Sequence, residues 1–241
     1  MKPAPFRKRI YGKPRRGVIF YFCGWRMPLW AYLPVYWIAN MAGYRVHAYS
    51  LAEEYIMEAD NKGFLNQLRA LTEDVEADVL GFHAQGVEFF ATFGNSMGSE
   101  LALACAKNIP AISAVVLNTI RGSTSDFLWN SPYGQAWKSL YEVQGYTEAT
   151  LYNDLRPVEA TEGLAKLGKR HVLLYYSRAD KTIPPNNTEL LVKALAAAGI
   201  KHRIIQNHYL GHFWASVKNH LYFWVWLGFL RQAEHRLRTH S

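Results

Sequence analysis

The sequence predicts one α/β domain in which a mostly parallel central sheet is flanked by helices. The chain has 241 residues, half of them hydrophobic, which is enough for one sizeable core. Apolar runs of strand length alternate with segments of helical spacing, and this alternation is typical of a parallel sheet. One apolar run stops abruptly at Gly94, Ser96 and Gly98, and a helix-forming segment follows at once.

The chain opens with a basic segment. Residues 1–16 contain seven Lys and Arg and no acid, so we expect a basic arm ahead of a domain at 17–241. The arm either aids solubility or makes weak contact with anionic surfaces. It accounts for seven of the eight net positive charges, which leaves the body nearly neutral. The body shows no basic stripe or stacking platform, so we predict no nucleic-acid binding.

In the first half of the domain, predicted strands alternate with predicted helices. Gly17–Cys23 is a continuous apolar run, typical of a strand covered on both faces, and residues 29–42 look helical. We expect a second strand at Arg45–Tyr49 and a helix over 60–78. The strand that leads to the serine turn follows.

The alternation of strands and helices stops after the strand predicted at Ile112–Asn118. Residues 119–163 are rich in Gly, Pro and aromatic residues, which predicts a short cap inserted over the sheet. Phe127, Trp129 and Trp137 of this cap are candidates for lining an apolar substrate pocket.

Strands resume at His171–Tyr176 and 202–206, with a helix over 187–198 between them. A long aromatic helix is expected to close the chain, and its apolar run Leu221–Leu230 is too short to span a membrane. The two cysteines, Cys23 and Cys105, fall in apolar runs and suit free buried thiols. They favour a reducing, cytoplasmic compartment, and nothing in the sequence specifies an oligomeric state.

The motif G-x-S-x-G at 94–98 points to nucleophilic catalysis. A serine between a strand and a helix sits in a tight turn with its hydroxyl clear of the backbone. The helix N-terminus supplies N–H groups that suit a developing oxyanion. We therefore predict that Ser96 attacks an acyl carbon.

Such a serine needs a base and an acid, and ligands collect at the carboxyl ends of parallel strands. His212 follows the last strand, and His208 is the alternative base. Asp180 follows the strand before it and is the expected acid. The cap residues Asp126 and Asp154 are the alternatives.

The oxyanion requires two placed donors. The backbone N–H of Met97 comes directly after the nucleophile, and that of Trp25 comes directly after the first strand. We expect both to serve, and the Trp25 ring also to line the pocket.

These motifs together resemble the α/β-hydrolase superfamily. The resemblance rests on G-N-S-M-G at 94–98, C-G-W at 23–25, R-A-D-K-T-I-P-P at 178–185 and L-G-H at 210–212. It implies an eight-stranded core and the site roles given above.

The sequence thus predicts a serine hydrolase that cleaves carboxylic esters of small to medium acyl groups through an acyl-enzyme. A lactonase, including one acting on acyl lactones, a thioesterase and an acyltransferase are alternatives on the same fold. A non-catalytic binding protein is a further one. The expected partner is a small-molecule ester or lactone. No cofactor is expected, and no metal-ligand motif is visible.

Overall fold

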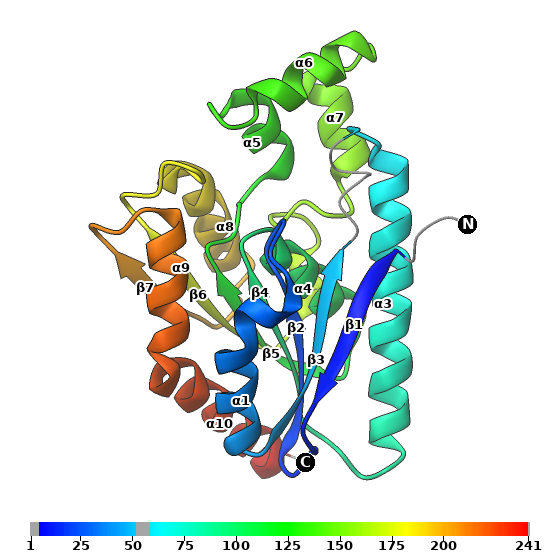
Figure 1. The fold of residues 1–241 in the computed structure, drawn as a ribbon, viewed down its shortest axis with the longest axis vertical. Helices are drawn as coiled ribbons and strands as arrows, with labels where there is room; N and C mark the ends of the chain where they lie inside the picture. The colour runs from blue at the N-terminus through cyan, green and yellow to red at the C-terminus, as the bar shows by residue number, and fades with distance from the viewer. Residues whose placement is uncertain (1–4, 52–57, 241) are drawn as a thin grey trace.

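The computed structural model describes residues 5–51 and 58–240 (Figure 1). Its sheet has seven strands in the order β1-β3-β2-β4-β5-β6-β7. Only β1 runs antiparallel to its neighbour, and every other pair is parallel. The strands are β1 (Phe6–Tyr11), β2 (Gly17–Phe22), β3 (Tyr44–Leu51), β4 (Phe90–Asn95), β5 (Ile112–Asn118), β6 (His171–Ser177) and β7 (His202–Asn207).

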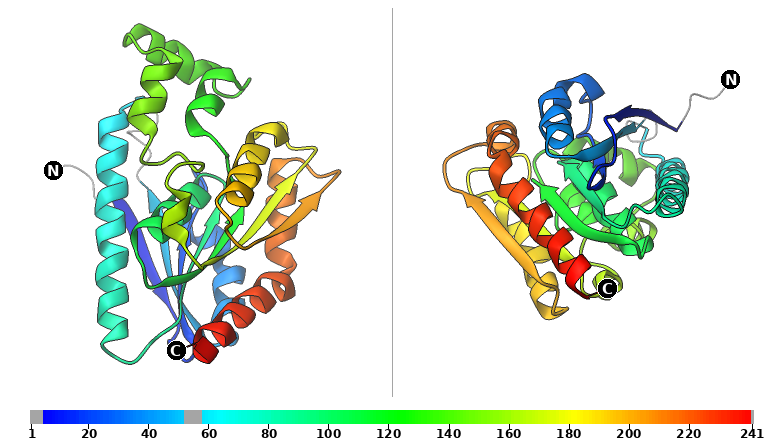
Figure 2. Two further views of the ribbon diagram at one scale, coloured as in Figure 1. Left: turned by 180° about the vertical axis from the view of Figure 1, so that it is seen from behind. Right: turned by 90° about the horizontal axis from the view of Figure 1, so that it is seen from below.

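Helices cover both faces of the sheet (Figures 1 and 2). One face carries the long α3 (Asn61–His83), α4 (Met97–Asn108) and α8 (Pro185–Ala197). The other carries η1 (Leu29–Tyr32), α1 (Leu33–Met41), α9 (His212–Leu221) and α10 (Phe223–His240). The mostly parallel sheet with flanking helices is confirmed.

The segment between β5 and β6 rises above the carboxyl edge of the sheet (Figure 1). It contains α5 (Thr124–Asn130), α6 (Gln135–Val143), α7 (Glu148–Leu155) and η2 (Leu164–Leu167). The α5 helix begins where the Ser123 hydroxyl accepts the N–H of Asp126, and α7 begins with a capping box at Thr147 and Thr150.

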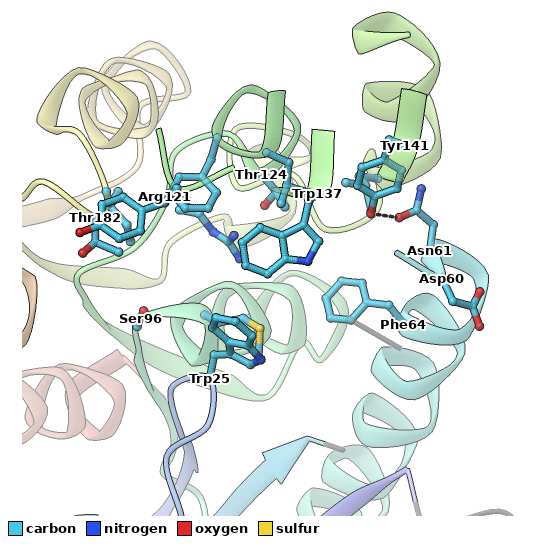
Figure 3. Close-up of a pocket in the computed structure, with 16 residues that line it drawn as sticks. Trp25, Asp60, Asn61, Phe64, Ser96, Arg121, Thr124, Trp137, Tyr141 and Thr182 are labelled. Carbon is cyan, nitrogen blue, oxygen red and sulfur yellow. Dashed lines mark hydrogen bonds between the residues drawn. The ribbon is translucent and has the colours of Figure 1, made fainter. Parts of the chain in front are cut away.

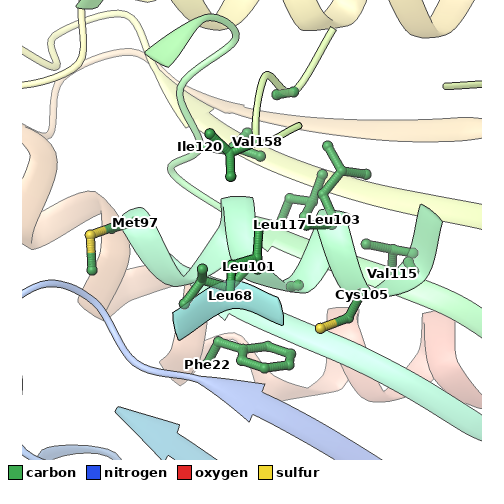
Figure 4. Packing of buried hydrophobic residues seen from close by; sticks show 14 of the residues in the cluster. Phe22, Leu68, Met97, Leu101, Leu103, Cys105, Val115, Leu117, Ile120 and Val158 are labelled. Carbon is green, nitrogen blue, oxygen red and sulfur yellow. The ribbon is translucent and has the colours of Figure 1, made fainter. Parts of the chain in front are cut away.

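Helix α4 is almost completely buried, since its first eleven residues all lie in the core. Leu101 and Leu103 pack beneath Ile120 and Val158 and against strand residues such as Phe22 (Figure 4). A helix buried on all sides fixes the direction of its N-terminus firmly, because its neighbours touch it everywhere. That N-terminus lies directly behind Ser96.

Three expectations need correction. Residues 6–11, assigned above to a basic arm, form the edge strand β1, because they pair antiparallel with β3; Lys8 also pairs at 2.6 Å with both Asp74 and Asp78 of α3. The eight strands implied by the resemblance are seven among the described residues. The closing helix is two helices, since the chain turns at Tyr222.

Within residues 5–51 and 58–240, every helix is too short or too polar to span a membrane.

Candidate active site

Ser96 occupies a sharp turn between β4 and α4. Its φ of +51° and ψ of −125° lie in a region that residues with a side chain rarely adopt. The turn is held because the Ser96 N–H donates to the carbonyl of Asn118 at 2.7 Å, and the Ser96 carbonyl accepts the N–H of Ser99 at 2.8 Å.

Two glycines allow this turn to sit close to the neighbouring backbone. A Cβ on Gly98 would lie 2.2 Å from the carbonyl oxygen of Phe22, at the end of β2. A Cβ on Gly94 would lie 2.3 Å from the carbonyl oxygen of Gly98. Any side chain here would push the helix away from the sheet.

The structure brings Ser96, His212 and Asp180 together. The Nε2 atom of His212 lies 3.0 Å from the Ser96 Oγ, and its Nδ1 lies 2.7 Å from Oδ2 of Asp180. The other oxygen of Asp180 accepts the N–H groups of Thr182 and Ile183, both at 2.9 Å. Those bonds fix the carboxylate plane, so the imidazole receives a defined orientation.

The alternative residues lie elsewhere. The His208 ring is exposed and lies against Tyr209. Asp126 accepts a hydrogen bond from Asn187 at 2.6 Å, and Asp154 accepts one from the hydroxyl of Tyr146 at 2.7 Å.

Both predicted oxyanion donors lie beside the serine. Met97 is the first residue of α4, and Trp25 lies two residues beyond Cys23, whose carbonyl Gly98 approaches. Among hydrogen bonds between described residues, none uses the backbone N–H of Trp25 or Met97. The loop that carries Trp25 is held at the preceding residue, since the Gly24 N–H donates to the Tyr32 hydroxyl at 3.3 Å.

A pocket of about 140 Å³ opens beside Ser96, beneath the cap (Figure 3). Trp25, Phe127 and Trp137 line it, as the sequence predicts. Trp129 does not. It lies two positions beyond Phe127 on α5, which turns its ring to another side of the helix, where the ammonium of Lys138 lies 5.2 Å from the ring centre.

Sequence reasoning missed the contribution of α3. The first turns of this helix reach up to the cap, where Phe64 lines the pocket and the Tyr141 hydroxyl donates to Asn61 Oδ1 at 2.6 Å (Figure 3). Phe64 belongs to the same apolar stripe as the core residues of α3, so its spacing alone does not set it apart.

Arg121, also missed, brings a charged group to the pocket. Its guanidinium is bound by both carboxylate oxygens of Glu100, one of them at 2.7 Å, and lies 4.8 Å from the ring centre of Phe127. Burial raises the pKa of Glu100, and the charge of Arg121 opposes that rise. A hydrogen bond from Thr124 Oγ1 at 3.2 Å further supports the carboxylate.

A buried polar network supports the site from behind. Asn95, the residue before Ser96, accepts the Ser216 hydroxyl at 2.5 Å and donates to the Tyr32 hydroxyl at 2.8 Å. Burial lowers the pKa of His220 to about 4, so this ring is neutral near pH 7. Its Nδ1 donates to the Ser216 carbonyl at 2.8 Å. The network ties α9, which carries His212, to the serine turn.

No group of three His, Cys, Asp or Glu side chains able to hold a metal ion occurs within residues 5–51 and 58–240. The Ser96 hydroxyl lies beside the His212 imidazole, and Trp25 and Met97, which carry the two expected oxyanion donors, line the same pocket as Ser96. Such a set can activate a hydroxyl and stabilise an oxyanion on an acyl carbon.

Comparisons with known proteins identify the family of this chain. The model of the prolyl oligopeptidase family, Peptidase_S9, matches residues 88–227, which is more than half of the chain. The chain belongs to the prolyl oligopeptidase family. It is therefore a member of the α/β-hydrolase superfamily and of a family of serine hydrolases. A search of curated proteins by sequence gave no significant match.

Solved structures share the fold at low sequence identity. Acylaminoacyl peptidase of Pyrococcus horikoshii superposes with a TM-score of 0.71 at 13% identity, covering 94% of this chain and 41% of its own. Acetyl xylan esterase 1 of a Thermoanaerobacterium species gives 0.67 at 15% identity, covering 86% and 74%. An esterase of Pyrococcus furiosus gives 0.61 at 12% identity, covering 92% and 81%. The chain thus spans less than half of the peptidase and most of each esterase.

Proposed function

We propose that this protein hydrolyses carboxylic esters of small to medium acyl groups by way of an acyl-enzyme. The observation that carries the proposal is the chain of two hydrogen bonds from Asp180 through His212 to Ser96, at the mouth of an apolar pocket. His212 takes the proton of the Ser96 hydroxyl as that oxygen attacks the ester carbon, and returns it to the leaving alcohol.

The remaining groups have complementary roles in this mechanism. The N–H groups of Trp25 and Met97 stabilise the oxyanion, and each such donor is worth roughly 3 kcal/mol in the transition state. Asp180 stabilises the imidazolium while its second oxygen stays bound to the backbone. Water, activated by His212, then releases the acyl group and restores Ser96.

The pocket favours an ester over a peptide. A bound peptide brings amide N–H and carbonyl groups that lose water and need new partners. The lining offers mainly rings and aliphatic chains, and the charge of Arg121 is already satisfied by Glu100. Peptide hydrolysis is the second candidate, because the family is named for a peptidase.

The test is a substrate panel read against Ser96→Ala. We expect p-nitrophenyl acetate and butyrate to be hydrolysed, with kcat falling by about 10⁴-fold or more in the variant. Ser139→Ala, an exposed serine of α6, is the matched control and retains full activity. A fluorophosphonate probe labels Ser96 in the native protein and nothing in Ser96→Ala.

Lactones, thioesters and peptide p-nitroanilides complete the panel. Faster ring opening of acyl lactones than hydrolysis of open-chain esters would replace the ester assignment by a lactonase. Faster cleavage of thioesters or anilides would replace it by a thioesterase or peptidase. Undiminished ester hydrolysis by pure Ser96→Ala would refute the mechanism itself.

A further inference from the structure

Half of the tryptophans of this chain are exposed on one side of the molecule. The sequence has eight, and Trp30, Trp37, Trp214 and Trp224 are 68%, 68%, 64% and 58% exposed. All four belong to η1, α1, α9 or α10, the helices that cover one face of the sheet. Large exposed rings gathered on one layer mark an interaction surface.

Three of these tryptophans and three exposed aliphatic side chains form two stripes. Trp30, Leu33, Trp37 and Met41 follow one another at intervals of three and four residues, so they lie along one side of η1 and α1. Trp214 and Leu221 are seven residues apart and lie along one side of α9. We call these six side chains the aromatic face.

The two stripes stand next to each other. Helices α1 and α9 lie side by side in Figure 1 and in the view from below in Figure 2. The rings of Tyr32 and His220 join the two segments, with centres 5.5 Å apart. The two stripes therefore lie on neighbouring helices of the same layer.

The chain segments that carry the aromatic face have a net positive charge. Residues 24–43 and 202–233, which include η1, α1 and α9, contain four Lys or Arg and no Asp or Glu. The next carboxylate, Glu234, is buried and bonded to Arg16 and Arg238. On the opposite face of the sheet, α3 mixes acids with bases. Positive charge with no exposed acid suits an anionic partner.

We propose that the aromatic face docks on the surface of an anionic phospholipid membrane. Trp and Tyr rings prefer the headgroup layer, where one end is apolar and the other wet, and Lys and Arg are drawn to anionic headgroups. A second copy of the chain fits less well, because it would set cations against cations. Nucleic acid fits less well too, because four cations are few for so much aromatic surface.

Docking in this way would bring the site close to the lipid. Each stripe begins at the edge of the sheet where Ser96 lies, since Trp30 is five residues beyond Trp25 and Trp214 two beyond His212. The membrane would then supply apolar esters directly to the pocket. This last step rests on the proposed function, whereas the docking does not.

The experiment measures binding of the full chain to vesicles by co-sedimentation and tryptophan fluorescence. We expect binding to equimolar phosphatidylglycerol and phosphatidylcholine at 0.1 M salt, with a blue shift of the emission. Binding should be weaker to phosphatidylcholine alone, and weaker at 0.5 M salt, where the Debye length is about half its value at 0.1 M. Trp37→Gln with Trp214→Gln weakens binding by at least about tenfold.

A matched pair of variants controls for general loss of apolar surface. Leu80→Gln with Val143→Gln removes side chains that are 64% and 89% exposed on α3 and α6, and binding stays as in the native chain. Circular dichroism checks that both pairs fold.

Three results would overturn the proposal. The first is no vesicle binding by the native chain, and the second is equal weakening by both pairs of variants. The third is self-association, or equal binding to polyglutamate, abolished by the changes at Trp37 and Trp214. None of these depends on hydrolysis, and use of Ser96→Ala protein in parallel keeps the two proposals separate.

Discussion

Replacing Gly98 by alanine tests how the serine turn is positioned. The new Cβ would lie 2.2 Å from the Phe22 carbonyl oxygen and 2.6 Å from that of Cys23, and real Cβ contacts stay above 3.0 Å. Because both opposing atoms belong to backbone, α4 and the end of β2 must separate by about 0.8 Å.

That separation acts directly on the reacting groups. The Ser96 oxygen lies 3.0 Å from Nε2 of His212, so a shift of this size would lengthen the contact beyond hydrogen-bond range. It would also part Met97 from the loop of Trp25. We expect kcat/KM for p-nitrophenyl butyrate to fall by about 10²-fold, with a loss of about 1–3 kcal/mol in the free energy of unfolding.

Gly228→Ala is the control. A Cβ at that position of α10 meets nothing within 4 Å, so activity stays unchanged and the free energy of unfolding rises by up to about 1 kcal/mol. Folding of Gly98→Ala is checked by urea titration. Native activity in a folded Gly98→Ala protein would show that the close approach does not position Ser96.

Three further predictions follow from single contacts. Asp180→Asn should lower kcat for the same ester by about 10³–10⁴-fold, with the urea midpoint largely kept; an unchanged kcat would exclude Asp180 as the orienting acid. The pKa of His220 is lowered to about 4 in the folded chain. Between pH 6.5 and 4 the unfolded chain therefore binds a proton that the folded chain does not. As the pH is lowered through this range, the free energy of unfolding falls by about 1.4 kcal/mol per pH unit. Urea midpoints across that range should show the slope in the native protein and a smaller one in His220→Gln. Lys8→Met should lower the free energy of unfolding by about 1 kcal/mol at low salt and by less at 1 M salt, because the pairs with Asp74 and Asp78 are partly exposed; an equal loss at both salt concentrations would contradict an ionic origin.

The sequence predicts what is encoded locally. Ser96, Asp180 and His212 each follow a strand, and parallel strands deliver their ends to one edge, so strand order along the chain suffices to bring the three together. The serine turn can be predicted because Gly94 and Gly98 flank Ser96 in the sequence.

What depends on distant contacts could not be predicted in this way. Phe64 lines the pocket only because α3 is long enough to reach the cap, which its stripe of core residues does not reveal. Lys8 belongs to a strand because β1 pairs with β3, about forty residues along the chain, and its charge is paired with Asp74 and Asp78. Trp129 has the right chemistry for the pocket but the wrong angle on its helix.

The cap contributes half of the sixteen side chains that line the pocket and none of the three that form the hydrogen-bonded chain at Ser96. The residues that react and most of the residues that select the substrate thus lie in separate segments of the chain. A library of variants confined to residues 119–163 could change which substrates bind in the pocket while the residues at the sheet edge remain unchanged. The same partition would let natural descendants of this chain drift toward new substrates without losing their chemistry.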